Sequence, residues 1–142
     1  MARTTYTELA SPEAERLVDA FFALGHVGYV ALGRGQEVLM RSHPDIVTET
    51  TPESNFYEEL LVNPTLLTLA GQRGGLDCGG LGYIAVGYGG FIEMIMRMKN
   101  GHVSLGVSPK TQVGEFAKRM QAVLEQHGAT YLPAAPSLLA KT

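Results

Sequence analysis

The residues of this chain best suited to chemistry are a single cysteine and four histidines, within 142 residues. Cys78 lies in the segment Asp77-Cys78-Gly79-Gly80. A nucleophilic cysteine needs a base within hydrogen-bonding reach and a third group that orients this base. No spacing places a histidine beside Cys78, because the histidines are scattered through the sequence as His26, His43, His102 and His127. We therefore interpret Cys78 as a loop or packing residue and not as a catalytic thiol.

A run of glycines is the second candidate for a site, and comprises Gly71, Gly74, Gly75, Gly79, Gly80 and Gly82. Backbone N–H groups of such a loop can hold a phosphate. A phosphate loop, however, leads from a strand into a helix and ends in Gly-Lys-Ser/Thr, whereas this segment is predicted to lead from a helix into a strand without that ending. We favour a conformational role. The alternative is a ligand or partner loop formed by Gly74, Gly75, Asp77, Cys78, Gly79 and Gly80.

Carboxylates and thioethers give no stronger signal. Glu58 and Glu59 are adjacent, so on a helix they point to different faces and do not form an acid–base pair. No histidine pair or histidine–carboxylate set has the spacing of a metal site. Met94, Met96 and Met98 alternate along a predicted strand, which indicates a sheet core and not a soft-metal site. We expect a protein that is not an enzyme and holds no metal or cofactor.

Composition narrows the class of partner. The net charge is −3 with no basic cluster, which argues against nucleic acid. The sequence shows no signal segment and no apolar run of membrane length, so we expect a cytoplasmic protein without membrane contact. Hydrophobic residues make up 45% of the chain and charged residues only 18%. This low charge indicates that another subunit covers part of the surface.

The elements that position these residues follow from caps and periodicity. Residues 1–10 are a polar lead, and Ser11-Pro12-Glu13 begins a helix that Gly25 ends. Two strands follow, at Val27–Leu32 and Gln36–Arg41. A second helical region covers 52–73, as two short helices or one kinked helix, because Asn63-Pro64 must interrupt it. The glycine run 71–82 is then expected to be a loop.

Three strands and a last helix complete the pattern. The strands are Leu81–Tyr88, Phe91–Lys99 and His102–Val107, and Asn100-Gly101 is expected to form a two-residue turn between the last two. That turn pairs Lys99 with His102, Met98 with Val103, Met96 with Leu105 and Met94 with Val107. One sheet face is then apolar, and the other carries Glu93, Ile95, Arg97, Ser104 and Gly106. A helix begins at Ser108-Pro109 or Thr111 and ends at Gly128.

The order of elements over residues 11–128 resembles the roadblock (dynein light-chain) family, whose fold is related to longin and profilin-like folds. The most similar segment is Leu81–Leu124, with its strand, its long hairpin and its closing helix. The resemblance implies an α/β (α+β) fold in the order α-β-β-α-β-β-β-α, with a central five-stranded antiparallel sheet and helices on both faces. We expect one domain over 1–130 and an extended tail over 131–142. The break at Asn63-Pro64 and the glycine run mark a divergent member.

The resemblance also implies a function. In this family the second helix and third strand form a homodimer interface, which here would involve Phe56, Leu60, Leu61, Leu66, Leu69, Leu81, Tyr83, Ala85 and Tyr88. The residues agree, since the strand carries no protective Lys, Glu or Pro and the helix is more apolar than a surface helix needs. Family members bind small Ras-like GTPases or serve as scaffolds. We expect a dimeric, non-enzymatic regulator or scaffold for a small GTPase in a prokaryote. The alternative is a small-ligand sensor that uses the loop 71–82.

Overall fold

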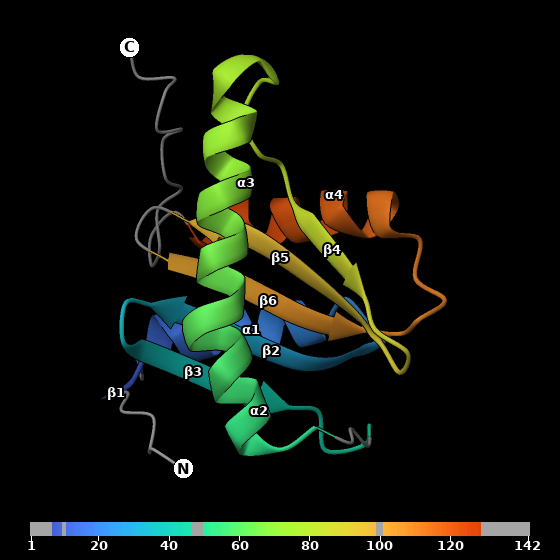
Figure 1. Cartoon of the computed structure of the whole chain (residues 1–142). Coiled ribbons are helices and arrows are strands. Elements are labelled where there is room, and N and C mark those ends of the chain that lie inside the picture. The colour runs from blue at the N-terminus through green and yellow to red at the C-terminus, as the bar shows by residue number, and fades with distance from the viewer. Residues whose placement is uncertain (1–6, 10, 47–49, 99–100, 129–142) are drawn as a thin grey trace.

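A six-stranded sheet in the order β1-β3-β2-β6-β5-β4 lies at the centre of the molecule (Figure 1). The computed structural model describes residues 7–9, 11–46, 50–98 and 101–128, so the expected tail at 131–142 lies outside the described residues. The elements are β1 (Thr7–Glu8), α1 (Pro12–Phe22), β2 (Val27–Arg34), β3 (Glu37–Ser42), α2 (Pro52–Tyr57), η1 (Glu58–Val62), α3 (Asn63–Asp77), β4 (Ile84–Gly87), β5 (Ile92–Met98), β6 (Gly101–Val107), α4 (Val113–Val123) and η2 (Leu124–Gly128).

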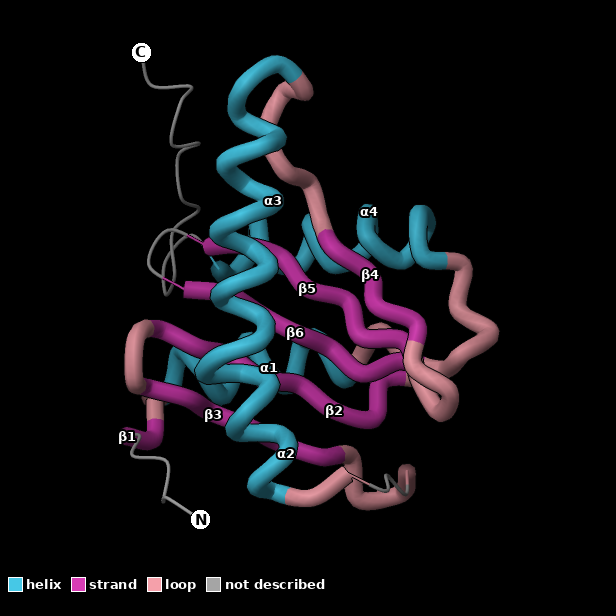
Figure 2. Tube along the Cα trace, viewed as in Figure 1, coloured by secondary structure: helices cyan, strands magenta, loops and turns pink. Residues whose placement is uncertain are grey.

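The expected fold class is confirmed. Strands β3, β2, β6, β5 and β4 form a five-stranded antiparallel sheet, and helices cover both of its faces (Figure 2). One addition was not predicted. The segment interpreted as a polar lead contains β1, which pairs in parallel with β3 through Thr7 and Glu37. A strand of two residues is too short to show the alternation that identifies a strand, so no pattern in the sequence predicts it.

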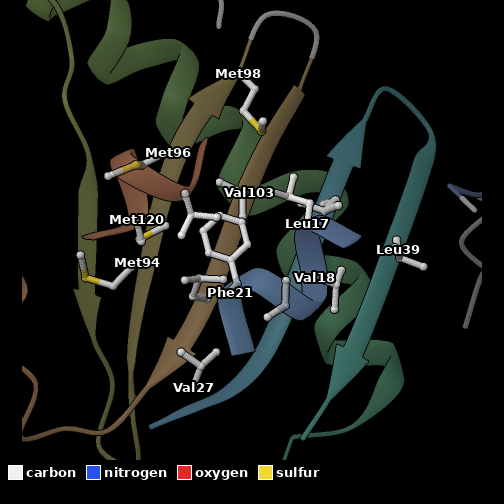
Figure 3. Packing of buried hydrophobic residues seen from close by; sticks show 14 of the residues in the cluster. Leu17, Val18, Phe21, Val27, Leu39, Met94, Met96, Met98, Val103 and Met120 are labelled. Carbon is white, nitrogen blue, oxygen red and sulfur yellow. The ribbon is translucent and has the colours of Figure 1, made fainter. Parts of the chain in front are cut away.

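One face of the sheet forms the hydrophobic core together with α1 and α4. Met94, Met96 and Met98 point into it, as expected, and pack with Phe21 and Met120 (Figure 3). Each such side chain contributes roughly 1.5–3 kcal/mol when it is fully buried. Ser11 caps α1 by accepting a hydrogen bond from the backbone N–H of Ala14 at 3.0 Å, as the sequence predicts.

Residues 52–73 are helical as predicted, but Asn63-Pro64 does not divide them into two separate helices, so that alternative was wrong. Helices α2, η1 and α3 run on without interruption across the other face of the sheet (Figure 1). The reason is the π-helical turn η1, in which the backbone N–H of Asn63 donates to the carbonyl of Glu58, five residues back. The wide turn makes room for the Pro64 ring where an α-helix would crowd it. Asn63 keeps helical angles, φ −65 and ψ −44.

The glycine run is also helical over much of its length, which corrects the predicted loop. Helix α3 continues to Asp77, and only the segment 78–83 connects it to β4. Glycine is unfavourable in a helix by about 1 kcal/mol relative to alanine, but packing overrides this preference. At Gly71 a Cβ atom would collide with the Arg97 guanidinium, and at Gly74 it would lie 3.1 Å from the backbone of Gly80. Because these two glycines have no side chain, the Arg97 side chain and the Gly80 backbone can approach the helix closely.

The hairpin of β5 and β6 has a register two residues away from the predicted one. Met98 pairs with Gly101, Met96 with Val103 and Met94 with Leu105. Residues 99–100, between Met98 and Gly101, lie outside the described residues. Gly101 belongs to the strand because it lies against the Gly33 carbonyl of β2, where no Cβ would fit. A shift of two residues leaves every side chain on its predicted face, so the core prediction holds.

Candidate functional site

The helical run from α2 to α3 has an inverted distribution of polar and apolar residues. Its buried side carries Glu59, Asn63, Leu67, Gly71 and Gly74. Its outer side exposes four large apolar side chains, Tyr57 at 59%, Leu61 at 53%, Leu69 at 61% and Leu76 at 65%. A helix at the surface of a monomer shows the opposite arrangement, with its apolar stripe toward the core. The outer side therefore has the character of an interface.

The predicted interface residues divide into an exposed group and a half-buried group. The exposed residues are Leu61, Leu69, Tyr83, Ala85 and Tyr88, and the half-buried residues are Phe56, Leu60, Leu66 and Leu81. Two exposed residues were missed. Tyr57 lies four residues before Leu61, a spacing that could have identified it. Leu76 was missed because its segment was interpreted as a loop.

The edge of the sheet beside this helical run is open. Within the part of the chain that the structure describes, β4 pairs with β5 and with no other strand. The strand is shorter than predicted, Ile84–Gly87 in place of Leu81–Tyr88, and it contains no Lys, Glu or Pro. An unprotected edge of this kind is a template for pairing with another strand. The Tyr88 hydroxyl donates to Glu58 Oε2 at 3.1 Å, which joins this edge to the helical run.

Beneath the helix lies a buried network of polar side chains centred on Glu59, which is only 1% exposed. Its carboxylate accepts hydrogen bonds from Ser104 Oγ at 2.6 Å and from the Tyr29 hydroxyl at 3.0 Å. His102 Nε2 lies 2.7 Å from Glu59 Oε1, and Asn63 Nδ2 donates to the same oxygen at 3.2 Å. Burial acts to raise the pKa of Glu59, but the hydrogen bond and charge of His102, together with the hydrogen bonds from Ser104 and Tyr29, outweigh burial and lower it.

Glu93 on β5 extends the network, and its charge state differs from that of Glu59. Asn63 Nδ2 donates to Glu93 Oε2 at 3.0 Å, so one amide joins the two carboxyls. Burial, the charge of Glu59 and a hydrogen bond with Glu58 together raise the pKa of Glu93 to about 9. Glu93 therefore carries a proton at neutral pH. Burial and the charge of Glu59 likewise raise the pKa of Tyr29, which stays protonated.

The network contains a serine, a histidine and a glutamate, but their arrangement does not fit nucleophilic catalysis. In a catalytic triad the histidine lies between the serine and the acid, whereas here Ser104 and His102 both bind Glu59. All three side chains are buried, Ser104 at 0% and His102 at 4% exposure, so a substrate has no path to them. No group of three potential ligands that could hold a metal ion occurs among the described residues. The geometry indicates a structural role.

Sequence reasoning missed this network, although weak signals were present. The sequence places Glu93 and Ser104 on a mixed sheet face and His102 beside a turn. It places Glu59 next to Glu58, with the two carboxyls on different helix faces. The spacing of Glu59 and Asn63 by four residues places both on one helix face. The alternation of Glu93 with buried methionines places its carboxyl on the second face of the sheet. What the sequence lacked was the contact between that helix face and that sheet face.

The predicted ligand loop divides between α3 and the segment after it. Gly74 is buried and Gly75 half-buried within α3, while Asp77, Cys78 and Gly79 are exposed and Gly80 is half-buried. Arg73 binds Asp77 at 2.7 Å, and this bond lowers the pKa of Asp77 and raises that of Arg73. Cys78 Sγ lies 3.4 Å from Arg73 Nη1 and 3.3 Å from Asp77 Oδ1. This surface cluster satisfies its own polar groups.

A cavity of about 580 Å³ lies between the start of α2 and the sheet, and the ligand loop takes no part in it. Its lining includes Tyr29, Ile46, Asn55, Phe91 and Val107. The segment 71–82, which is the end of α3 and the connection after it, lies at the other end of the helical run (Figure 1). The structure therefore does not bring the predicted ligand residues to this cavity. No helix among the described residues is long and apolar enough to cross a membrane.

Comparisons with known proteins bear on the fold. No protein-family model and no curated protein matches this chain in sequence. Solved structures do match. A Roadblock/LC7 domain from Streptomyces avermitilis is 13% identical over 72% of this chain and 82% of that chain, with a TM-score of 0.50. MglB with a tetrameric arrangement is 12% identical over 89% of this chain and 98% of that chain, with a TM-score of 0.59. The chain has a divergent roadblock-like fold.

Proposed function

We propose that this chain is a non-enzymatic homodimeric adaptor that regulates or scaffolds a small Ras-like GTPase. The observation that carries the proposal is the inverted helical run, which exposes Tyr57, Leu61, Leu69 and Leu76 and buries Glu59 and Asn63. Four large apolar side chains on one helical run form a patch that a soluble monomer rarely leaves uncovered. A second copy covers it with the same four side chains.

The open edge of β4 supports a two-fold dimer. Two copies of β4 can pair in antiparallel fashion across a two-fold axis, which extends the sheet and satisfies the free backbone groups of both strands. The exposed helical side chains then meet their counterparts beside the same axis. This arrangement protects the edge and the apolar side at once. The tetrameric arrangement of MglB, a protein of similar fold, is consistent with assembly through surfaces of this fold.

The GTPase part of the proposal rests on the roadblock-like fold and on what the family resemblance implies. The non-enzymatic part is supported by the buried Glu59 network, whose geometry gives no nucleophile–base contact. Cys78, the other candidate nucleophile, lies beside Arg73 and Asp77, and no histidine of the described part of the chain hydrogen-bonds to it. The protein would therefore act through the surface it presents as a dimer.

The dimer is tested with charge placed on the exposed helical side. Leu61→Glu and Leu69→Glu each bring a carboxylate to the two-fold axis, and both residues are solvent-exposed in one copy, so the fold of the monomer is preserved. We expect the wild type to have twice the chain mass by multi-angle light scattering at micromolar concentration and the variants to be monomeric. Ala122→Glu on α4, at an exposed position on the other side of the sheet, is the matched control and should stay dimeric. A monomeric wild type would refute the dimer.

The partner is tested separately. Small Ras-like GTPases from the same organism are loaded with a GTP analogue or with GDP and mixed with the wild type. We expect co-elution in one nucleotide state and a changed rate of GTP hydrolysis, both lost in Leu69→Glu. Unchanged hydrolysis and no co-elution with any of these GTPases would leave the dimer standing and remove the GTPase role.

A further inference from the structure

We propose that Glu93 is a positioning residue whose bound proton holds the α2–η1–α3 run on the sheet, and that loss of this proton loosens the run and the dimer with it. The first half of the proposal concerns the folded chain alone. The second half rests on the proposed dimer, because the same helical run carries the exposed residues Leu61 and Leu69.

The proposal begins from a continuous path of hydrogen bonds. Glu59 binds Asn63, and Asn63 binds Glu93. Glu93 shares a hydrogen bond with Glu58, and Glu58 accepts from the Tyr88 hydroxyl at 3.1 Å. Tyr88 is 40% exposed and follows the open strand β4. The path therefore leads from the buried centre of the molecule to the edge that the dimer would use.

A hydrogen bond between two carboxyls needs a proton on one of them. Glu58 is half-buried, whereas Glu93 is 2% exposed and faces two other carboxyls from η1. A proton on Glu93 makes it a donor to Glu58 while its other oxygen accepts from Asn63. Without that proton, Glu93 is a buried carboxylate that faces the carboxylates of Glu58 and Glu59. The contact between η1 and β5 then becomes repulsive.

In the part of the chain that the structure describes, no positively charged side chain near Glu93 takes the place of this proton in offsetting its negative charge. Glu58 and Glu59 face it from η1, Tyr29 from β2 and Tyr88 from the segment after β4. His102 on β6 is already bound to Glu59 at 2.7 Å. Arg97, on β5 like Glu93 itself, lies against Gly71, further along the helix. Within the described residues no ion pair reaches Glu93.

The direction of the pH effect follows from the raised pKa of Glu93, about 9 against 4.5 in an unfolded chain. The folded state binds the proton more tightly than the unfolded state does. The contribution of Glu93 to stability is therefore complete below 4.5 and declines as pH rises toward about 9. At neutral pH the proton is still bound and the helical run is held, and above about 9 it is lost.

The test compares the wild type with Glu93→Gln, which keeps the shape and the donor of a protonated Glu93 but cannot ionise. Both are made with Cys78→Ser, which removes the exposed thiol from the comparison. Relative to Glu93→Gln, the folding equilibrium constant of the wild type should fall by up to about tenfold per pH unit between about pH 6 and about pH 9. Amide exchange in α3 and the monomer fraction should rise with pH in the wild type only.

Two further measurements separate the possible failures. Infrared spectroscopy at neutral pH should show a protonated carboxyl band in the wild type that is lost in Glu93→Gln. If Glu93→Gln does not fold, Glu58→Gln serves instead, since removal of a neighbouring carboxylate should end the decline at lower pH. A monomer at every pH would refute the dimer but leave the α3 exchange as a test of the proton. Equal pH responses in wild type and Glu93→Gln would overturn the proposal even for a dimer.

Discussion

At the scale of single residues, Glu59 is the side chain on which the packing of the helical run depends most. It is 1% exposed, and its two oxygens bind Ser104, Tyr29, His102 and Asn63. A buried carboxylate of this kind is tolerated only because donors surround it. Ser104, Tyr29 and His102 would each lose this buried partner if Glu59 were removed, and Asn63 would keep only its bond to Glu93.

Glu59→Ala should therefore destabilise the protein by about 3–5 kcal/mol, the range for breaking one partner out of a buried polar cluster. Urea unfolding followed by circular dichroism measures this loss. Glu125→Ala, at an exposed position in η2, is the control and should change stability by no more than about 0.5 kcal/mol. A loss below 1 kcal/mol for Glu59→Ala would contradict the central role of this carboxylate.

The pH dependence of Glu59 is opposite to that of Glu93. Its pKa is lowered in the folded state, so its hydrogen bonds contribute fully above the unfolded value of 4.5. The contribution is lost as pH falls through the folded pKa. With Glu93 declining toward about 9, the two carboxyls together favour a stability maximum on the acidic side of neutrality.

At the scale of elements, the glycines of α3 show how tertiary contacts decide a helix. Gly74→Ala should destabilise the protein, although alanine is the better helix former, because its Cβ would lie 3.1 Å from the Gly80 carbonyl. Backbone cannot move aside as a flexible side chain can, and we expect a net loss of about 1–2 kcal/mol. Gly114→Ala in α4 meets nothing within 4 Å and should gain up to about 1 kcal/mol. Thermal unfolding of both variants decides the matter, and a gain for Gly74→Ala would show that the contact is easily relieved.

The elements divide into those that local sequence specifies and those that it does not. Helix α1 was predicted because Ser11, Pro12 and an apolar stripe all act within the helix itself. The helical region 52–73 was predicted too, but its continuity across Asn63-Pro64 and its extension to Asp77 were not, because Pro64 and the glycines argue locally against both. What reverses them are contacts far away in sequence, with Glu93 and Arg97 on β5. The predicted register of β5 and β6 was wrong for the same reason, because the position of Gly101 depends on its close approach to Gly33 on β2.

At the scale of the whole molecule, the two faces of the sheet are held by different forces. One face is closed by apolar packing of α1 and α4, and the other by the polar network under the helical run. The outer side of that run and the edge of β4 are the surfaces left for association. Apolar spacing along the chain predicted Leu61 and Leu69, which are exposed, but it did not identify Tyr57 or Leu76. The buried network could not be predicted, because its members come from five separate elements.

Tyr83→Lys tests the edge of the sheet independently of the helical side. Tyr83 is 38% exposed just before β4, and a lysine there would place two like charges close to the two-fold axis. We expect a lower dimer fraction, and a thermal midpoint that no longer rises with protein concentration as it does for a wild-type dimer. Sedimentation velocity and thermal scans over a hundredfold range of concentration, about 1–100 μM, provide the readout. An unchanged dimer would exclude pairing of the strands at this edge.

The π-helical turn η1 determines the direction in which the exposed apolar side of the α2–η1–α3 run points. A helix advances by about 100° per residue, so one residue absorbed in a π turn changes the rotational phase of everything after it by roughly that angle. Without that residue, Leu69 and Leu76 would turn away from the side that Tyr57 occupies, and Leu67 would leave the sheet. The turn thus acts as a phase corrector, which keeps two halves of one long helix facing the same two surroundings.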